Sequence, residues 1–357
     1  MGTPKYAIVQ EWIKSEINKG TYKNGEKMLS ENELMEKFNF SRQTIRLAIS
    51  NLENQGYLEK IKGSGTYVRI KGGGSNRETR NIGVIITYLD EYIFPEIIKG
   101  IENVLSENNY NITLGITYNK VEKETSILNS LINKKVDGII VEGTKSAIPN
   151  PNKEIYAQFK KNIPCVFING NYPGLDIPLC SMNDVEGGYM AANYLIERGH
   201  KKIGAAFKSD DIPGHRRYEG FMKAVHKSNI TIDEKNILWY TTEDLEYLFK
   251  GDADSILLKR FECCTGIVCY NDQMALNVIR FLERNNIKPF DDVSIIGFDN
   301  STLSKFLDLT SIDHMKYDLG ALAAEVLIKQ IKTGEKTGAK IKTEIIERAS
   351  VKDIRKI

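Results

Sequence analysis

Three side chains in the segment SRQTIRLAISNL (residues 41–52) could read the base sequence of DNA. Arginine can pair with guanine, and glutamine with adenine, in the major groove. Apolar residues recur in the segment at i, i+3, i+4 and i+7, so a helix there would bury one stripe. Arg42, Gln43 and Arg46 would then face outward from its first two turns. An ordinary amphipathic helix with a solvated polar face is the alternative, and the segment alone does not decide between them.

A second set of side chains could bind the hydroxyl groups of a small ligand. Polar residues directly follow four apolar runs: Glu142 after GIIV, Asn169 after CVFI, Asn271 after IVCY and Asp299 after IIGF. Ligands of parallel α/β sheets bind beyond the carboxyl ends of the strands. Carboxylates, amides and an arginine suit hydroxyls, because a hydroxyl both donates and accepts. The predicted ligand-binding set is Tyr92, Phe94, Glu142, Asn169, Arg217, Asn271 and Asp299, with the two aromatic residues supplying apolar faces.

Two alternatives compete with this interpretation. An Asp or Asn at a strand end is often only a helix N-cap or a turn residue. The carboxylates Glu142 and Asp299 could also serve an enzyme, but the sequence has no nucleophile elbow, metal-ligand spacing or phosphate loop. The four histidines, His200, His215, His226 and His314, are scattered. We therefore predict that the protein is not an enzyme and holds no metal or cofactor.

The first seventy residues predict a winged helix-turn-helix. A helix is expected from about Pro4 to Lys19, and a second opens at Ser30, which forms a capping box with Glu33. The reading helix follows after a tight turn, with Ser41 as its N-cap. Two strand-like runs, Tyr57–Ile61 and Thr66–Ile70, then flank a glycine-rich turn. Residues 1–70 are thus predicted as a DNA-binding domain and residues 71–79, which contain KGGGSN, as a flexible linker.

The remaining residues, 80–357, alternate strand and helix patterns. Strands are predicted at 82–87, 111–116, 136–141, 165–168, 202–207, 266–269 and 293–298, with helices between them. Such alternation is typical of α/β folds with parallel, doubly wound sheets. The length predicts two lobes, one of about 80–171 and 313–340, the other of about 172–312 and 341–357.

The charge distribution favours DNA binding by the first residues, and the cysteine content indicates the cellular compartment. Residues 1–71 carry 12 Lys and Arg against 8 Glu and no Asp, a net charge of +4, and the rest carries 37 against 39, a net charge of −2. The basic excess thus lies with the predicted reading helix, as phosphate binding requires. Five cysteines without Cys-x-x-Cys spacing, and the lack of a signal segment or long apolar run, predict a cytoplasmic protein that does not enter membranes.

The segment LSENELMEKFNFSRQTIRLAISNLENQGYLEKIKGSGTYV resembles the DNA-binding domain of GntR-type bacterial regulators. The resemblance implies that the reading helix and the wing contact DNA, while members often carry arginine where this chain has Asn32. The predicted DNA-binding set is Lys5, Arg42, Gln43, Thr44, Arg46, Lys62, Ser64 and Gly65.

The motifs VDGIIVEG, IPCVFING, HRRYEGF, GIVCYNDQMALNVIRFLERNNIKPFDDVSIIGFDN and LTSIDHMKYDLG resemble the effector domain of LacI/GalR repressors. By position, Arg217, Asn271 and Asp299 match family residues that bind the effector. The GntR-type head replaces the usual N-terminal module, and the linker helix that inserts between base pairs is missing.

The pairing of these two domains resembles a group of sugar-responsive repressors of low-GC Gram-positive bacteria. That resemblance implies a homodimer through the C-terminal domain, double-stranded operator DNA with near-palindromic half-sites, and release when a sugar binds. L-arabinose as the effector rests on the resemblance alone, since the residues indicate only a small polyhydroxylated ligand. An activator of the same architecture, or a response to another sugar, remains open at this point.

Overall fold

The computed structural model describes residues 4–23, 25–61, 63–68, 79–89 and 93–356. The chain divides into two compact units, Met1–Glu78 and Thr79–Ile357. Most of the predicted linker lies outside the described residues. Thr79, its predicted last residue, belongs to the second unit, because its backbone N–H donates to Asp137 at 3.0 Å.

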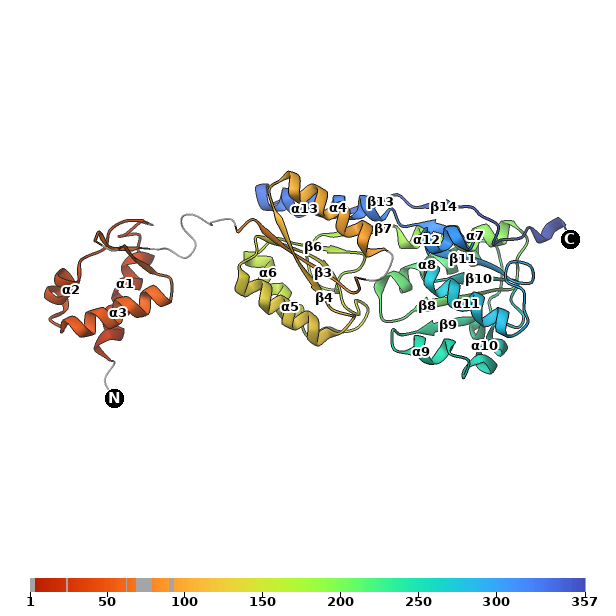
Figure 1. Ribbon diagram of the computed structural model, residues 1–357, viewed down its shortest axis with the longest axis horizontal. Helices are drawn as coiled ribbons and strands as arrows, with labels where there is room; N and C mark the ends of the chain where they lie inside the picture. The colour runs from red at the N-terminus through yellow and green to blue at the C-terminus, as the bar shows by residue number, and fades with distance from the viewer. Residues whose placement is uncertain (1–3, 24, 62, 69–78, 90–92, 357) are drawn as a thin grey trace. The chain divides into compact units, whose positions relative to one another are not determined.

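In its described residues, the first unit has three helices and a two-stranded hairpin (Figure 1). The helices are α1 (Lys5–Asn18), α2 (Glu31–Phe38) and α3 (Arg42–Asn54), and the antiparallel strands are β1 (Leu58–Ile61) and β2 (Gly65–Val68). Their apolar faces share one core, in which Val9, Ile13, Leu34, Ile45 and Leu52 are fully buried.

Capping side chains define where the second and third helices begin. Ser30 and Glu33 form the predicted capping box: the Ser30 hydroxyl accepts the Glu33 N–H, and the Glu33 carboxylate accepts the Ser30 N–H at 2.7 Å. The Ser41 hydroxyl accepts the Thr44 N–H. Between the two helices Asn39 has a φ of 52°, a left-handed conformation that asparagine tolerates well. This tight turn fixes how α3 leaves α2.

Lobe one of the second unit is built on a six-stranded sheet of order β13-β7-β6-β5-β3-β4, with all neighbours parallel. One face is covered by α4 and α13, whose apolar side chains pack against Ile82 and Ile140 of the sheet. The other face is covered by α5 and α6. The strands are β3 (Asn81–Ile86), β4 (Asn111–Ile116), β5 (Gly138–Glu142), β6 (Cys165–Ile168), β7 (Leu179–Met182) and β13 (Ala339–Ile341). The helices are α4 (Phe94–Glu107), α5 (Val121–Lys134), α6 (Lys153–Asn162) and α13 (Lys316–Thr333).

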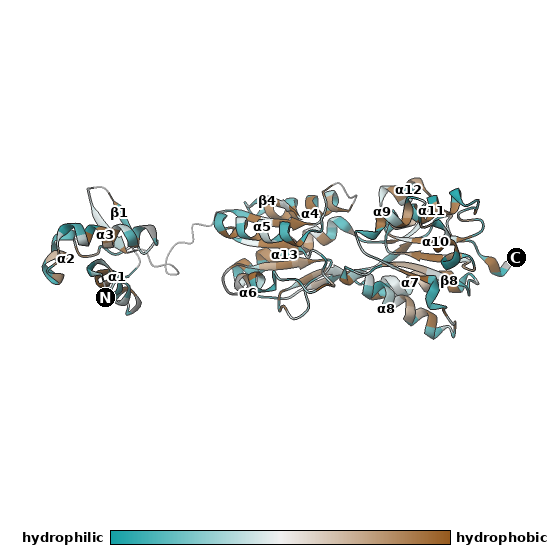
Figure 2. Cartoon of the chain, turned by 90° about the horizontal axis from the view of Figure 1, so that it is seen from below, coloured by the Kyte–Doolittle hydropathy of each residue, from teal (hydrophilic) through white to brown (hydrophobic). Residues whose placement is uncertain are grey.

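Lobe two repeats the plan with a sheet of order β14-β12-β11-β10-β8-β9, in which only the β14–β12 pairing is antiparallel among those described. Its strands are β8 (Ile203–Lys208), β9 (Ile237–Tyr240), β10 (Gly266–Cys269), β11 (Ser294–Asp299), β12 (Thr310–Asp313) and β14 (Glu344–Ile346). Its α-helices are α7 (Asp184–Glu197), α8 (Ile212–Lys227), α9 (Asp244–Phe249), α10 (Asp254–Phe261), α11 (Asp272–Arg284) and α12 (Thr302–Phe306), and two 3-10 turns are η1 (Glu234–Asn236) and η2 (Ile354–Lys356). The strands of both sheets are largely hydrophobic and the outer helix faces hydrophilic (Figure 2).

The chain crosses between the lobes three times: from β7 to α7, from β12 to α13, and from β13 to β14. The predicted first boundary, at residues 171–172, is wrong. Residues 172–182 belong to lobe one, because Tyr172 and Ile177 lie in its core and β7 pairs with both β6 and β13. Among the described residues, no helix is long and apolar enough to cross a membrane.

Each lobe contains a helix pair that meets at two glycines. A Cβ on Gly100 or Gly320 would lie about 2 Å from a backbone oxygen of the partner helix, in the α4–α13 pair. In lobe two, a Cβ on Gly188 would lie 2.0 Å from the Arg217 carbonyl oxygen, and one on Gly220 would lie 1.9 Å from the Val185 oxygen. Backbone therefore packs directly on backbone where α7 crosses α8.

We expect Gly188→Ala to destabilise the second unit by about 1–3 kcal/mol, because the added methyl group forces the two helices apart. Urea denaturation would measure the change. Glu186→Ala is the matched control, since Glu186 is exposed on the same helix, and it should change the unfolding free energy by less than about 0.5 kcal/mol. Equal effects of the two substitutions would contradict the close packing.

Candidate DNA-reading face and effector cleft

The helix α3 presents a polar face to solvent. Its apolar stripe, Ile45, Ala48, Ile49 and Leu52, is at most 3% exposed. The side chains of Arg42 and Arg46 are 55% and 62% exposed, and Gln43 is also exposed. The structure therefore places the three predicted base-reading residues on one accessible ridge.

The carboxylate of Glu31, at the start of α2, lies among the cations of this face. It accepts from Arg46 Nε at 2.9 Å and from Lys60 Nζ at 3.1 Å, and Arg42 Nε lies 3.7 Å away. Burial raises the pKa of Glu31, but the hydrogen bonds from Arg46 and Lys60 outweigh it and hold the pKa below its ordinary value. The sequence prediction omitted both Glu31 and Lys60.

The other predicted DNA-contacting residues lie in several places. Thr44 is half-buried and bonds the Ser41 hydroxyl at 2.9 Å. Ser64, in the turn of the wing, bonds the Tyr67 hydroxyl at 2.5 Å, and Gly65 has a φ of 135°, which favours glycine. The Lys5 ammonium lies 5.4 Å from the centre of the Phe40 ring. Lys62 lies outside the described residues.

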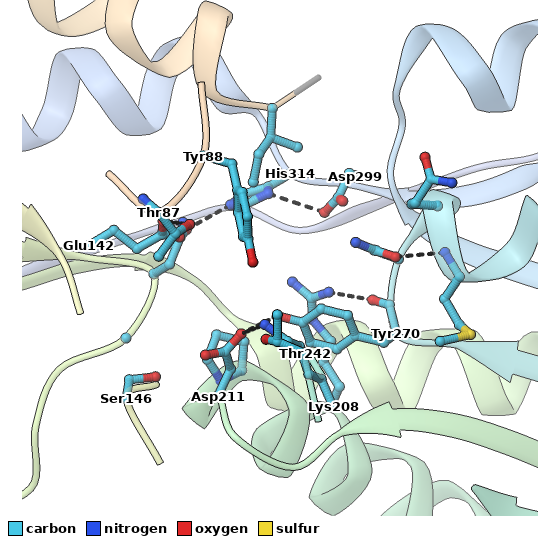
Figure 3. A pocket seen from close by; sticks show the side chains of 18 of the residues that line it. Thr87, Tyr88, Glu142, Ser146, Lys208, Asp211, Thr242, Tyr270, Asp299 and His314 are labelled. Atoms are coloured by element: carbon cyan, nitrogen blue, oxygen red, sulfur yellow. Dashed lines mark hydrogen bonds and ion pairs between the residues drawn. The ribbon is translucent and has the colours of Figure 1, made fainter. Parts of the chain in front are cut away.

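The second unit has a cavity of about 870 Å³, its open mouth included, between the carboxyl ends of the two sheets (Figure 3). Residues of both lobes line it. Of the predicted ligand-binding set it brings together Phe94, Glu142, Asn169, Arg217, Asn271 and Asp299. Tyr92 lies outside the described residues. Phe94 is 1% exposed and also belongs to the core of lobe one, so it has a packing role as well.

Arg217 is anchored on several sides. Its Nε donates to Asp184 at 2.9 Å, with both side chains almost fully buried, and its Nη1 donates to the Tyr270 carbonyl at 2.5 Å. The guanidinium also lies over the Phe298 ring. Burial lowers the pKa of Arg217, but the Asp184 carboxylate raises it by more. The guanidinium is thus a fixed cation in the wall of the cavity.

Asp299 and Asn271 reach the cavity from neighbouring strands. Burial raises the pKa of Asp299, but His314, Arg217 and Lys316 outweigh it and hold the pKa below its ordinary value. The Asp299 backbone has a φ of 97°, a strained conformation of a kind found at binding sites. The Asn271 Oδ1 caps α11 by accepting the Met274 N–H at 2.8 Å. The side-chain oxygen of Asn271 thus acts as a helix cap, as the alternative interpretation predicted.

Glu142 and Asn169 lie against each other in lobe one. Glu142 accepts hydrogen bonds from the backbone and hydroxyl of Thr87 at 3.1 and 2.5 Å, and from Asn169 Nδ2 at 2.8 Å. Burial raises the pKa of Glu142, and these hydrogen bonds only partly oppose the rise. Both oxygens of Glu142 therefore accept hydrogen bonds from residues of lobe one.

The cavity contains further polar residues that the sequence prediction missed. Lys208 Nζ donates to Asp211 at 2.6 Å, and Tyr88 and Tyr270 approach the cavity from opposite lobes (Figure 3). Burial lowers the pKa of Lys208, but Asp211 and Asp210 raise it by more, so the lysine is charged. Lys208 could have been predicted from the sequence, because the segment KSDD directly follows a predicted strand. His314, one of the four scattered histidines, also lines the cavity.

Hydrogen bonds join the two lobes beside the cavity. Asn119 of lobe one donates through Nδ2 to Thr242 Oγ1 at 2.6 Å and to Asp210 at 3.4 Å. Ser146 of lobe one accepts the Ile212 N–H at 2.9 Å. The two lobes are therefore closed against each other in this structure.

Comparisons with known proteins agree with both units. Residues 5–68 match the family model of bacterial regulatory proteins of the gntR family, and residues 192–351 match that of the periplasmic binding protein-like domain. The chain is 39% identical over 339 residues to the arabinose metabolism transcriptional repressor of Halalkalibacterium halodurans, covering 93% of this chain and 90% of the relative. It is 36% identical to the protein of the same name from Geobacillus stearothermophilus, over 98% of both chains.

A solved structure shows the same body. The periplasmic binding protein/LacI transcriptional regulator from Alkaliphilus metalliredigens QYMF, complexed with D-xylulofuranose, superposes with a TM-score of 0.65 at 26% identity. The superposition covers 76% of this chain and 99% of that chain.

A winged helix-turn-helix joined to a two-lobed body with a central cleft defines a DNA-binding transcription regulator controlled by a small ligand. The predicted fold class is confirmed, and so is the prediction of a regulator instead of an enzyme. The chain belongs to the family of transcriptional repressors that includes the arabinose metabolism repressors of the two organisms above.

Proposed function

We propose that the protein represses sugar-utilisation genes and leaves its operator when L-arabinose enters the cleft. The observation that carries the proposal is that one chain holds an exposed Arg42–Gln43–Arg46 ridge and a cleft lined from two lobes by charged and amide groups. The names of the two relatives supply the choice of arabinose.

The cleft suits a pentose for chemical reasons. Asp299 and Asn271 offer acceptors and donors in fixed orientations, and Arg217 offers a buried cation. Planar groups of this kind can bond neighbouring hydroxyls in pairs. Tyr88 and Tyr270 supply apolar faces for the C–H side of the sugar ring. These contacts come from both lobes, so the sugar binds most tightly when the lobes are closed.

We further propose that the protein acts as a homodimer through its second unit, with two heads on the half-sites of a near-palindromic operator. Closure would change the dimer so that both heads no longer fit one operator. A linked loss of about 1–3 kcal/mol per ligand is enough for control.

A gel-shift titration of the full chain on its own upstream DNA, with and without sugar, tests this function. L-arabinose is expected to release the DNA, whereas D-xylose, D-ribose and D-glucose are not. If another sugar releases the DNA and arabinose does not, the assignment of the effector is wrong. If sugar strengthens DNA binding, repression by release is wrong.

The hydrogen bonds that join the lobes beside the cleft should set how much sugar is needed for release. Asn119→Asp places a carboxylate against buried Asp210 and opposes closure, while aspartate still tolerates the φ of 54° found there. We expect the affinity for arabinose to fall by about tenfold, or about 1.4 kcal/mol.

Sugar-free operator affinity of the Asn119→Asp variant should stay equal or rise. Calorimetric titration and gel shift measure the two affinities. Asn103→Asp, at an exposed site on α4, is the matched control and should change neither. An unchanged arabinose affinity in Asn119→Asp would show that these contacts do not govern closure.

A further inference from the structure

A buried carboxyl group lies behind the cleft, in the interior of lobe one. Glu124, in the first turn of α5, is 0% exposed. Its Oε1 lies 2.9 Å from the Tyr156 hydroxyl and 2.7 Å from the Tyr172 hydroxyl. Its Oε2 accepts from the side-chain nitrogens of Asn150 and Asn152 at 2.9 and 2.8 Å. A buried carboxyl group is costly unless hydrogen bonds replace its lost hydration, so this network is built around Glu124.

Backbone groups fix the orientation of both asparagine amides. Asn150 Oδ1 accepts the Asn152 backbone N–H at 2.8 Å, so the Asn150 amide nitrogen is the atom that faces Glu124. The Asn152 amide nitrogen also lies 3.3 Å from the Val121 carbonyl oxygen, which can only accept. Burial, and then the charge of Glu124, raise the pKa of both tyrosines, so the two phenols keep their protons. All four side chains can therefore donate to this carboxyl group.

Three of the four donors hold one loop, residues 143–152, which connects β5 to α6. Both asparagines lie near its end. The Tyr172 hydroxyl also lies 2.9 Å from the Thr144 carbonyl oxygen, near the start of the loop. Between these anchors Lys145 has a φ of 47°, a left-handed conformation that is unfavourable for lysine and persists only where the surroundings impose it. The buried network thus holds the loop in one strained shape.

The same loop contacts lobe two at the edge of the cavity. The Ser146 hydroxyl, which also lines the cavity (Figure 3), accepts a backbone N–H of lobe two at 2.9 Å. The Ala147 N–H donates to the Asp210 carbonyl oxygen at 3.1 Å. The Lys145 ammonium forms an ion pair with Glu243. Three consecutive residues of one loop therefore bind the opposite lobe, and their positions depend on the anchors behind them.

We propose that Glu124, together with the Tyr172 hydroxyl, is a positioning residue that fixes the 143–152 loop in the shape required for lobe closure and thereby raises the affinity for the sugar. The inference rests on the function proposed above and identifies a residue that governs the same site from behind it. Neither side chain lines the cavity, so each acts on the sugar through the loop. A loop without these anchors would have to be ordered on closure, which weakens binding.

Calorimetric titration of the full chain with L-arabinose tests the proposal through a matched pair of substitutions. Tyr172→Phe and Tyr156→Phe each remove one hydroxyl from the same carboxyl oxygen, but only Tyr172→Phe also removes the bond to the loop. We expect Tyr172→Phe to bind arabinose about fivefold more weakly than wild type, and Tyr156→Phe to lose less than about twofold. Equal losses would overturn the proposal, because a purely structural network would not distinguish the two hydroxyls.

Glu124→Met removes the acceptor of all four donors and leaves an unbranched, adaptable side chain in its place. It should bind arabinose about tenfold more weakly than wild type. Glu122→Met is the matched control, since Glu122 is exposed in the same turn of α5, and it should bind as wild type does. Wild-type affinity in a folded Glu124→Met chain would overturn the proposal. Thermal denaturation establishes folding, and the tyrosine pair decides the question if this variant does not fold.

A double-mutant cycle tests whether the loop acts through closure. Asn119→Asp already weakens the contacts between the lobes, so Tyr172→Phe should reduce arabinose affinity less in that background than in wild type. Additive losses would show that the two residues act independently, which would overturn the route through closure.

Hydrogen exchange of residues 143–152 in the sugar-free full chain gives a readout that does not depend on the effector. Glu124→Met and Tyr172→Phe should speed exchange there by about tenfold, whereas Tyr156→Phe should not. Unchanged exchange in Glu124→Met and Tyr172→Phe would overturn the positioning role, whichever sugar binds. A wild-type chain that binds no arabinose, in a series that shows the expected exchange pattern, would overturn the proposed effector instead.

Discussion

Replacing Asp299 with alanine is expected to abolish the sugar response while operator binding survives. The carboxylate is 3% exposed, lines the cleft, and accepts from His314. Its removal takes away an acceptor for the sugar and leaves the Arg217 cation without the charge of a neighbouring carboxylate. Hydrogen bonds to charged groups contribute about 1.5–3 kcal/mol each, so arabinose affinity should fall by about a hundredfold. Calorimetric titration measures this loss.

The control for Asp299 also tests the separation of the two units. Asp308→Asn removes the same charge from an exposed site of lobe two with a φ of 53°, which asparagine tolerates, and should leave the sugar response unchanged. Asp299→Asn keeps the shape and removes only the charge, so it should weaken binding less than alanine does. If Asp299→Ala abolishes both sugar and operator binding in a folded chain, the division of labour between the units is wrong.

Most elements of both units could be predicted from the sequence because local patterns determine them. The strands β4, β6 and β10 are found at the predicted residues. Capping chemistry located the starts of α2 and α3. The missed elements lack such signals. The four-residue strands β7 (LCSM) and β12 (TSID) contain polar residues, unlike the apolar runs of β6 and β10, and β13 and β14 have only three residues each. Only the sheets that they complete make them strands.

Four residues of the candidate cleft could be predicted because each ends or follows a strand that the sequence reveals. Glu142, Asn169, Asn271 and Asp299 could be found in this way, since parallel strands bring their carboxyl ends to one edge. His314 could not, because its position depends on a chain crossing between lobes and its partner Asn169 lies 145 residues away. Glu31 was missed for a related reason. It is the first residue of α2, and only the packing of α2 on α3 brings it to Arg46.

Replacing Arg46 with alanine is expected to weaken operator binding by about 10–100-fold, because a base-reading arginine contributes about 1–3 kcal/mol. The side chain is 62% exposed on the reading ridge, so its removal leaves the core of the first unit intact. Arabinose affinity should not change. Gel shift on the operator and on a scrambled duplex would measure both affinity and base preference.

The pairing with Glu31 makes this prediction sharper. In the free protein Arg46 is held by that carboxylate at 2.9 Å, so contact with a base must compete with an existing ion pair. Exposed ion pairs contribute only about 0–1 kcal/mol, which is less than a bidentate contact with guanine. Arg46 is therefore expected to leave Glu31 and contact the base when DNA binds. The binding energy lost in Arg46→Ala is the energy of the guanine contact minus that of the ion pair.

Lys19→Ala is the control that removes an equal charge, since Lys19 follows α1, is well exposed and forms an ion pair with Glu16, three residues away. It should reduce affinity for operator and scrambled DNA alike, and by less than Arg46→Ala reduces operator binding. If a substitution removes a phosphate contact, the slope of log affinity against log salt concentration falls by about one for both DNAs. If Arg46→Ala lowers both affinities equally and reduces that slope, Arg46 contacts the phosphate backbone, and the base preference must come from Arg42 and Gln43.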